Sequence, residues 1–238
     1  MGSIELFSLE GVVECSIVRR LNRFVILVRR SGVEYLAHTN NTSRLRGFLE
    51  EGRRAYCLPR SGGKTQYRLV AVECPGYREA ALIDTGLQMR GFEKAVEKGV
   101  IPWLRGCRVI SRNPRVGGSL LDYLLRCGDE DVYVEVKSAT LRLPGDLAAY
   151  PDPASMRGRR HVEELTRLAE SGKRAFLVFI AGIPGARGLT LYREADPVLP
   201  GLVKKAIEKG VVVKAVAMSF DPRGARIVLY SVDLPVVI

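Results

Sequence analysis

The sequence lacks any long apolar run. The longest, at Ala175–Ile183, is about half of the ~20 residues that a transmembrane helix needs, which excludes a membrane span. The opening Met1-Gly2-Ser3-Ile4-Glu5 also lacks the basic segment followed by an apolar one that marks a signal peptide. We therefore expect a cytoplasmic protein without a membrane partner, and the sequence leaves a homo-oligomer open.

Cysteine is scarce and irregularly spaced. No two of the five cysteines form a CxxC pair, and an odd number cannot pair completely. This spacing is neither a zinc pattern nor a disulfide framework, so we expect buried free thiols. The five are Cys15, Cys57, Cys74, Cys107 and Cys127.

Lysine and the side-chain amides are also scarce, with nine lysines, four asparagines and two glutamines. The 37 basic residues, set against 26 acidic ones for a net charge of +11, are therefore mostly arginine. Because the planar arginine fork suits phosphate, this excess favours a nucleic-acid partner, DNA first and RNA as the alternative. A bland explanation stays open, because an amide-poor, arginine-rich composition is also typical of heat-adapted proteins.

The composition predicts a folded protein, because 47% apolar and 26% charged residues exclude a disordered chain. We expect two domains. Residues 1–80 show short strands separated by turn signals, with one helix predicted at Arg44–Glu51. Such a pattern suits a small closed barrel of the OB type, a fold that often binds single-stranded nucleic acid. The predicted strands are Val12–Arg20, Arg23–Arg30, Val33–Ala37, Arg54–Leu58 and Tyr67–Glu73.

The predicted barrel carries the denser positive charge. Residues 1–80 hold 13 basic and 8 acidic residues, whereas the other 158 residues hold 24 and 18. We assign contacts with a nucleic-acid backbone here to Arg23, Arg44 and Lys64, the last at a predicted hairpin tip.

Residues 81–238 predict a mixed α/β domain, which places the whole chain in the α+β class. Helices and strands follow one another as a meander and then a crossover. The predicted helices are Thr85–Lys98, Arg159–Ser171 and Pro200–Lys209. The predicted strands are Cys107–Arg112, Ser119–Arg126, Val132–Ser138, Arg174–Ile180, Val211–Met218 and Arg226–Ser231.

One predicted hairpin carries the chemistry. Gly128-Asp129 suits a tight turn, and a hairpin centred there pairs residues whose numbers sum to 257. Asp122 then lies opposite Glu135, and Leu120 opposite Lys137, all on one face. The other face is continuously apolar and pairs Leu121, Tyr123 and Leu125 with Val136, Val134 and Val132.

Two carboxylates this close repel each other unless a cation lies between them, so Asp122 and Glu135 predict a site for Mg²⁺ or Mn²⁺. Lys137 points the same way and would activate a water or stabilise developing negative charge. An Asp followed by Glu-x-Lys on the next strand is the core of the PD-(D/E)xK nuclease pattern. The alternative is a solvated trio of charges on an antiparallel sheet, without a catalytic role.

At these residues the sequence resembles the sugar fermentation stimulation protein family, over nearly the whole chain. Residues 133–141 are similar to the family's Tyr-Val-Glu-Val-Lys-x-x-Thr-Leu, and residues 117–123 to its Gly-x-Ser-Arg-x-Asp-Phe. Further matches, in the same order as in the family, are Arg23-Phe24, Ala37-His38, Asn41-Thr42, residues 64–67, Asp84-Thr85, residues 150–153, Arg157-Gly158 and residues 160–165. The resemblance implies an OB-like domain, a restriction-endonuclease-like domain, DNA binding and metal-dependent nuclease chemistry.

Two departures from the family pattern concern the site. Where the family usually has Glu and Arg, this chain has Asn113 and Leu120, so a carboxylate and a cation are lost. Asp122, Glu135 and Lys137 are retained, and we interpret the catalytic face as kept, with less charge around it.

The helix predicted after the hairpin carries a second polar group. His161 and Glu164 are three residues apart on one helix face and would support the hairpin residues; the alternative is an exposed pair. Arg157, Arg159 and Arg160 precede them and would contact phosphates, unless they form only a solvated basic turn.

Three functions are consistent with these residues. The first is a DNA-binding protein with a metal-dependent phosphodiesterase site, that is, a nuclease. The second is a non-catalytic regulatory protein that binds nucleic acid and whose nuclease site has decayed. The third, with less support, is an enzyme that acts on another phosphate ester with the same metal chemistry.

Overall fold

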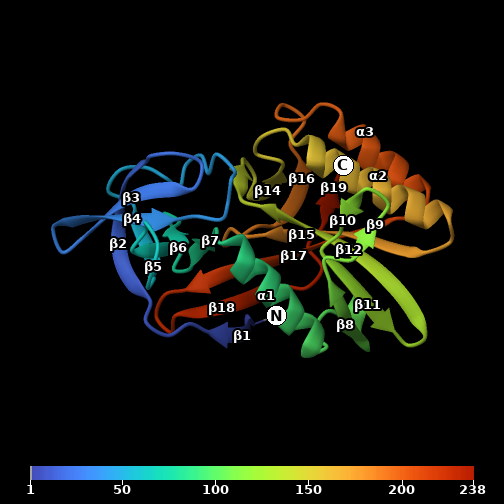
Figure 1. The fold of residues 1–238 in the computed structure, drawn as a ribbon, viewed down its shortest axis with the longest axis horizontal. Coiled ribbons are helices and arrows are strands. Elements are labelled where there is room, and N and C mark those ends of the chain that lie inside the picture. The colour runs from blue at the N-terminus through green and yellow to red at the C-terminus, as the bar shows by residue number, and fades with distance from the viewer. Residues whose placement is uncertain (1) are drawn as a thin grey trace.

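The computed structural model describes residues 2–238 and shows two lobes that share one long sheet (Figure 1). The first lobe is a barrel with the strand order β4-β3-β2-β5-β6, closed by parallel pairing of β4 with β6. Its strands are β2 (Val13–Arg20), β3 (Val25–Arg30), β4 (Val33–His38), β5 (Arg54–Pro59) and β6 (Tyr67–Glu73). Every strand predicted for the barrel is present, and the OB-like barrel is confirmed.

The predicted helix at Arg44–Glu51 is wrong, because this segment forms turns. Its backbone enters the left-handed region at Leu45 (φ 54°) and Gly47 (φ 77°), which an α-helix excludes. The Leu45 N–H instead donates to the buried Asp152 carboxylate of the second lobe at 2.8 Å. A contact between distant parts of the chain thus overrides the local helical pattern.

The sheet continues from the barrel through β7 into the second lobe, where its order is β17-β15-β12-β11-β8. β12, β15 and β17 are parallel, and the crossovers between them place α2 and α3 on one face, whereas α1 packs on the other. The helices are α1 (Thr85–Glu97), α2 (Met156–Glu170) and α3 (Leu199–Glu208), with a 3₁₀ turn η1 at Pro102–Leu104. The strands are β7 (Ala80–Leu82), β8 (Cys107–Arg112), β11 (Tyr123–Cys127), β12 (Glu130–Ala139), β15 (Arg174–Ala181), β17 (Val212–Asp221) and β18 (Arg226–Ser231).

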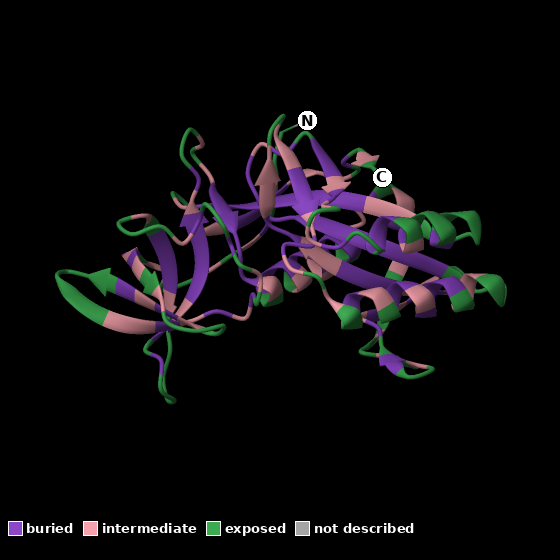
Figure 2. Ribbon diagram, turned by 90° about the horizontal axis from the view of Figure 1, so that it is seen from above, coloured by how far each residue is buried: buried purple, intermediate pink, exposed green. Residues whose placement is uncertain are grey.

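Buried strands therefore fill the middle of the second lobe, and exposed residues lie on the outer faces of its helices (Figure 2). The three helices and the longer strands agree with the prediction, and the mixed α/β architecture is confirmed. Among the described residues, no helix is long and apolar enough to span a membrane.

Several short strands were not predicted. The first of them, β1, pairs with β18, so the start of the chain completes the sheet of the second lobe. The segment between β12 and α2 contains two more, β13 and β14. Together with β16 and β19 they form a separate sheet in the order β13-β14-β16-β19. The short strands are β1 (Ile4–Ser8), β9 (Arg115–Val116), β10 (Ser119–Leu120), β13 (Leu141–Leu143), β14 (Leu147–Tyr150), β16 (Gly188–Leu191) and β19 (Val236–Val237).

The predicted hairpin register is confirmed where β11 pairs with β12, since Tyr123 lies opposite Val134. The single predicted strand Ser119–Arg126 is wrong, because the chain breaks at Leu121 and Asp122 into β10 and β11. β10 pairs with β9, so Leu120 lies opposite Arg115 and not opposite Lys137. The apolar face predicted from Leu121 onward is interrupted as well. Leu121 packs in the core on the α2 side, whereas Tyr123 packs on the α1 side.

Cys107 and Cys127 form a disulfide, so the expectation of free thiols is wrong for these two residues. They lie directly opposite each other where β8 pairs with β11. Their separation of 20 residues does not reveal this, because the pairing depends on how β8 aligns with a strand beyond the β9–β10 hairpin. Cys15, Cys57 and Cys74 are buried free thiols, as expected.

Removing the disulfide should destabilise the protein. Closing a loop across a separation of 20 residues restricts the unfolded chain and contributes about 3 kcal/mol to the free energy of unfolding. We expect the double variant Cys107→Ala/Cys127→Ala to have a free energy of unfolding that is lower by about 3 kcal/mol, and so to unfold at a lower urea concentration. Reductant should weaken the parent protein and leave the variant unchanged; equal midpoints for the two proteins without reductant would contradict the expectation.

Candidate active site

Three elements bring the predicted catalytic residues together. β12 lies inside the sheet between β11 and β15 and carries both Glu135 and Lys137. α2 covers this part of the sheet and places His161 against Glu135. Asp122 lies at the break between β10 and β11, where its Oδ2 accepts a hydrogen bond from the Val136 N–H at 2.7 Å. The result is one cluster of Asp122, Glu135, Lys137 and His161.

Glu135 is the centre of this cluster and is 2% exposed. Its Oε1 accepts a hydrogen bond from Lys137 Nζ at 2.5 Å and also contacts His161 Nδ1. Its Oε2 is buried, and no group in residues 2–238 donates to it. Because a buried carboxylate oxygen without a partner is unfavourable, Oε2 is the atom that an added cation would contact.

Arg157 fixes the orientation of the His161 ring. The Arg157 Nε donates to His161 Nε2 at 3.4 Å, which makes Nε2 the acceptor nitrogen and leaves the ring proton on Nδ1. Nδ1 then donates to Glu135 Oε1. His161 is 4% exposed, so the alternative of an exposed pair with Glu164 is wrong. It orients Glu135 from within the protein.

The charges in the cluster influence one another strongly. Burial and repulsion from Glu135 raise the pKa of Asp122 from 3.8 to about 6. Burial alone would also raise the pKa of Glu135, but the charge of Lys137 and the hydrogen bond from His161 hold it below its ordinary value. Burial acts on Lys137 in the opposite direction, and Glu135 outweighs it, so the pKa of Lys137 is raised. At neutral pH an ionised Glu135–Lys137 pair thus lies beside a carboxyl group that protonates easily.

Asp122 and Glu135 are the residues of the cluster that could hold a divalent cation. Within residues 2–238, no group of three or more His, Cys, Asp or Glu side chains could hold a metal ion alone. Mg²⁺, however, commonly binds one or two carboxylates and completes its shell with water and substrate phosphate oxygens. The free Oε2 of Glu135 and the neighbouring Asp122 meet this requirement.

The two departures from the family pattern lie beside Asp122. The Asn113 N–H donates to the Asp122 carbonyl oxygen at 3.0 Å, and the Asn113 backbone is left-handed (φ 54°). Asparagine adopts this conformation more readily than most residues. Leu120 is 43% exposed in the β9–β10 hairpin. Neither side chain adds a charge to the cluster.

Glu164 lies on the same helix as His161 but supports a different segment. Its carboxylate packs against Gly117 in the β9–β10 hairpin, and its Oε1 pairs with Arg167 at 2.8 Å. A Cβ at position 117 would lie 2.9 Å from Glu164 Oε2, and φ there is 52°, so glycine is favoured. Glu164 therefore holds the hairpin that leads into Asp122.

The barrel residues assigned to nucleic acid lie on exposed loops. Arg20, which the sequence analysis missed, donates to the carbonyl oxygens of Arg23 at 2.7 Å and of Arg44 at 3.3 Å. It thereby holds two neighbouring loops from which Arg23 and Arg44 are exposed. Phe24 beside them is 49% exposed, and Lys64 lies at the exposed β5–β6 turn. No local pattern distinguishes Arg20 from the other arginines, because its partners are backbone oxygens.

The three arginines at the start of α2 differ from one another. Arg157 and Arg160 are exposed. Arg159 donates through Nη2 to Asp196 at 2.7 Å, and Asp196 is 1% exposed. This ion pair fastens α2 to the loop before α3, so a structural role competes with the predicted phosphate contact of Arg159.

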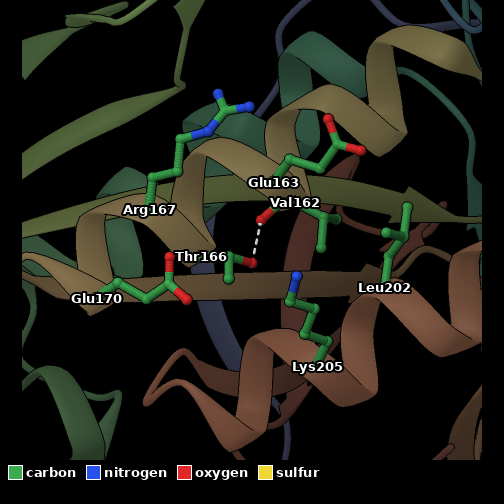
Figure 3. Close-up of a pocket in the computed structure, with 7 residues that line it drawn as sticks. All are labelled: Val162, Glu163, Thr166, Arg167, Glu170, Leu202 and Lys205. Carbon is green, nitrogen blue, oxygen red and sulfur yellow. Dashed lines mark hydrogen bonds between the residues drawn. The ribbon is translucent and has the colours of Figure 1, made fainter.

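A hollow lies between α2 and α3 (Figure 3). Its volume is about 260 Å³, and none of the four cluster residues lines it. It is lined by Val162, Glu163, Thr166, Arg167, Glu170, Leu202 and Lys205. Unlike Glu135, none of these seven residues has a buried side-chain nitrogen or oxygen without a hydrogen-bond partner.

Comparison with known proteins gives a consistent result. Residues 18–83 match the profile of the SfsA N-terminal OB domain, and residues 86–224 that of the sugar fermentation stimulation protein RE domain. The chain is 44% identical to a sugar fermentation stimulation protein homolog of Pyrococcus furiosus, over 98% of this chain and 99% of that one. A homolog of Archaeoglobus fulgidus is 43% identical over 99% and 100%. The solved structure of Pyrococcus furiosus SfsA in complex with Ca²⁺ matches with a TM-score of 0.93 and 43% identity, over 99% and 100% of the chains.

Replacing Asp122 by Asn should stabilise the metal-free protein at neutral pH. Its folded-state pKa of about 6 lies above the ordinary 3.8, so the native protein binds this proton more tightly than the unfolded chain. Ionisation between about pH 4 and pH 6 therefore lowers the free energy of unfolding, and the loss persists at higher pH. We expect Asp122→Asn to raise that free energy on the order of 1–3 kcal/mol at pH 8 and to change it little at pH 4.

Urea denaturation in EDTA at the two pH values measures this difference. Asp131→Asn is the matched control, since Asp131 is a carboxylate on the neighbouring strand β12 that is 40% exposed and pairs with Arg126. A loss of stability at pH 8, or an equal gain at both pH values, would show that Asp122 is not under this electrostatic stress.

Proposed function

Because the chain belongs to the sugar fermentation stimulation protein family, we propose that it is a DNA-binding protein whose second domain hydrolyses phosphodiester bonds with a divalent metal. One observation carries the proposal. Glu135 has one oxygen engaged by Lys137 and His161 and a second that is buried without a donor among the described residues. A solvated surface trio has no such oxygen, whereas metal-assisted attack on a phosphate uses one.

Each residue of the cluster then has a role. Asp122 and Glu135 would hold Mg²⁺ or Mn²⁺, which when bound supplies a Lewis acid for the phosphate and makes a bound water more acidic. Lys137 remains charged through its pairing with Glu135 and would donate to the attacking water or to a phosphate oxygen. His161 keeps Oε1 of Glu135 engaged and so leaves Oε2 as the ligand atom.

The relative from Pyrococcus furiosus supports a divalent cation. That protein was solved in complex with Ca²⁺ and is 43% identical to this chain over almost its whole length. Ca²⁺ and Mg²⁺ both take oxygen ligands. A carboxylate site for a divalent ion in the present protein is consistent with that structure.

We propose that the first domain holds the nucleic-acid strand. Its exposed Arg23, Arg44 and Lys64 would contact phosphates, and Phe24 offers a ring on which a base can stack. On the second domain, Arg157 and Arg160 at the start of α2 would add phosphate contacts near the cluster. We propose that the chain divides into two domains, residues 1–80 and 81–238. β1, although it belongs to the first range, pairs with β18 of the second domain.

The second candidate is a regulatory protein that binds nucleic acid without cutting it. Asn113 and Leu120 favour it, because the positions beside Asp122 carry no charge. The intact cluster of Asp122, Glu135, Lys137 and His161 argues against it, since nothing in a binding protein requires a buried carboxylate with an unpartnered oxygen.

Cleavage is the direct test. We expect the parent protein to cut end-labelled single- or double-stranded DNA with Mn²⁺ or Mg²⁺ and not in EDTA, as measured on denaturing gels. Asp122→Asn should lower the rate by about 100-fold or more, because it removes a charged ligand atom. Since the same variant should be more stable at neutral pH, unfolding cannot explain that loss.

The controls separate the two candidates. Asp131→Asn should cut like the parent protein, and Lys137→Met should lose activity while its thermal melt confirms that it is folded. Cleavage that survives both Asp122→Asn and Lys137→Met would overturn the site assignment. Tight binding without cleavage by the parent protein would favour the regulatory candidate.

Binding by the barrel gives a separate prediction. Phe24→Ala should weaken the affinity for single-stranded DNA by about 5- to 50-fold, since stacking on one aromatic ring contributes about 1–3 kcal/mol. Ile207→Ala on α3 is the control, because Ile207 is a comparably exposed apolar residue at 44%. Affinity measured in EDTA by fluorescence anisotropy should also fall steeply as salt rises. A flat salt response would rule out phosphate contacts as the source of binding.

A further inference from the structure

A pocket of about 360 Å³ lies where the barrel meets the second domain. Its walls come from the loop after β4, from the β6–β7 connection and from β13 with the turn that follows it. The residues that matter here are Arg46, Phe48, Arg53, Cys74, Tyr77 and Arg142. The volume is in the range of small-ligand sites, and both domains contribute to it.

The pocket is positively charged at its floor. Arg142 donates to Asp146 at 2.7 Å and to the Tyr77 hydroxyl at 3.2 Å, and its Nε is buried without an acceptor among residues 2–238. Arg53 is 15% exposed and pairs with Glu50. With the exposed Arg46, three arginines thus face two carboxylates, Asp146 and Glu50.

The charges of two pocket arginines influence the pKa of the Cys74 thiol. Burial raises its pKa, while the charges of Arg142 and Arg53 oppose the rise. Two guanidinium groups from different domains therefore influence one point on the pocket floor. An anion that enters the pocket would be attracted to the same point.

Two aromatic residues provide flat walls. Phe48 is 4% exposed, and Tyr77 is half-buried with the Arg142 guanidinium 4.7 Å from its ring centroid. Tyr77 is also held against Gly185, where no Cβ would fit, and its hydroxyl donates to Asp146 at 2.9 Å. The Arg142 guanidinium lies over this ring, so a planar base in the pocket would pack against the part of Tyr77 that lines it and against Phe48.

β14 links the pocket to the active site. The strand starts directly after Asp146 and ends at Tyr150, whose ring packs against Phe179, the residue opposite Lys137 where β12 pairs with β15. Its four residues span about 13 Å, since each strand residue adds roughly 3.3 Å. The pocket and the cluster therefore lie at opposite ends of β14, roughly 13 Å apart.

We propose that this pocket binds one nucleotide of the strand whose phosphodiester bond lies at the active site. The base would pack against Phe48 and Tyr77, and the phosphate would lie near Arg46 and Arg53. The inference rests on the proposed nucleic-acid function and adds a distance: the DNA strand is held roughly 13 Å, the length of β14, from the bond that is cut.

Binding in EDTA tests the pocket without any need for cleavage. We expect Arg46→Ala to weaken binding of a single-stranded 12-nucleotide DNA by about 3- to 10-fold, as one phosphate contact is lost. Arg105→Ala is the matched control, because it removes the same charge from an exposed position after η1. A deoxynucleoside monophosphate should compete with the bound DNA better than inorganic phosphate does in the parent protein, and both competitors should bind more weakly to Arg46→Ala.

Crosslinking tests the predicted position. A single photoreactive 4-thiothymidine, moved stepwise along the DNA, should label peptides containing residues 46–53 or 74–77 at one position only. Equal effects of Arg46→Ala and Arg105→Ala, equal competition by phosphate and nucleotide, or no labelling of these peptides would each overturn the inference. If the parent protein does not cut DNA but these results are obtained, the pocket stands and the nuclease proposal fails.

Discussion

The second domain depends on one buried negative charge, that of Glu135. Moving a carboxylate into the middle of a sheet is costly, and the protein offsets this cost on one oxygen only. Lys137 reaches that oxygen from the same strand, and His161 reaches it from α2, so the charge ties the helix to the sheet. The second oxygen stays without a donor in residues 2–238, and the neighbouring Asp122 is disfavoured in its ionised form. Sites that work against stability in this way are typical of function.

The shared sheet connects the two domains directly and fixes their relative position. β7 joins β6 of the barrel to β17 of the second domain, and the Leu45–Asp152 hydrogen bond crosses between them. Arg68 of the barrel also donates to the buried Asp84 at 2.6 Å, at the start of α1. These contacts fix the barrel relative to the cluster, so under the proposed function a nucleic-acid strand would meet preformed surfaces on both sides of the junction.

The sequence predicts those parts of the fold that local patterns determine. The pairing of β11 with β12 follows from the turn at Gly128-Asp129 and from alternation, and it places Glu135 and Lys137 on one face. The break at Leu121 and Asp122 could not be seen, because it depends on the β9–β10 hairpin and on Glu164 packing against Gly117. The break nevertheless leaves Asp122 in the cluster, for a reason other than the predicted strand pairing: its carboxylate is bonded to the Val136 N–H.

The same limit explains the other differences. The turns at residues 44–51 replace a helix because Asp152 binds Leu45 from far along the chain. The disulfide joins Cys107 to Cys127 because β8 pairs with β11. β1 joins the part of the sheet in the second lobe because it pairs with β18. Each of these features needs a partner whose position no short stretch of sequence contains.

The net charge of +11 is a poor guide to the interface until the ion pairs are known. Several arginines are engaged by buried or half-buried carboxylates, among them Arg159 with Asp196 and Arg226 with Asp221. These charges stabilise the fold and add little to the attraction of a polyanion, since each is neutralised at short range. If the proposed function holds, the arginines that remain exposed on the barrel loops, at the domain junction and at the start of α2 would determine where a nucleic-acid strand can lie. Asp122 and Glu135 would then need a bound cation to approach its phosphate, because two carboxylates alone repel it.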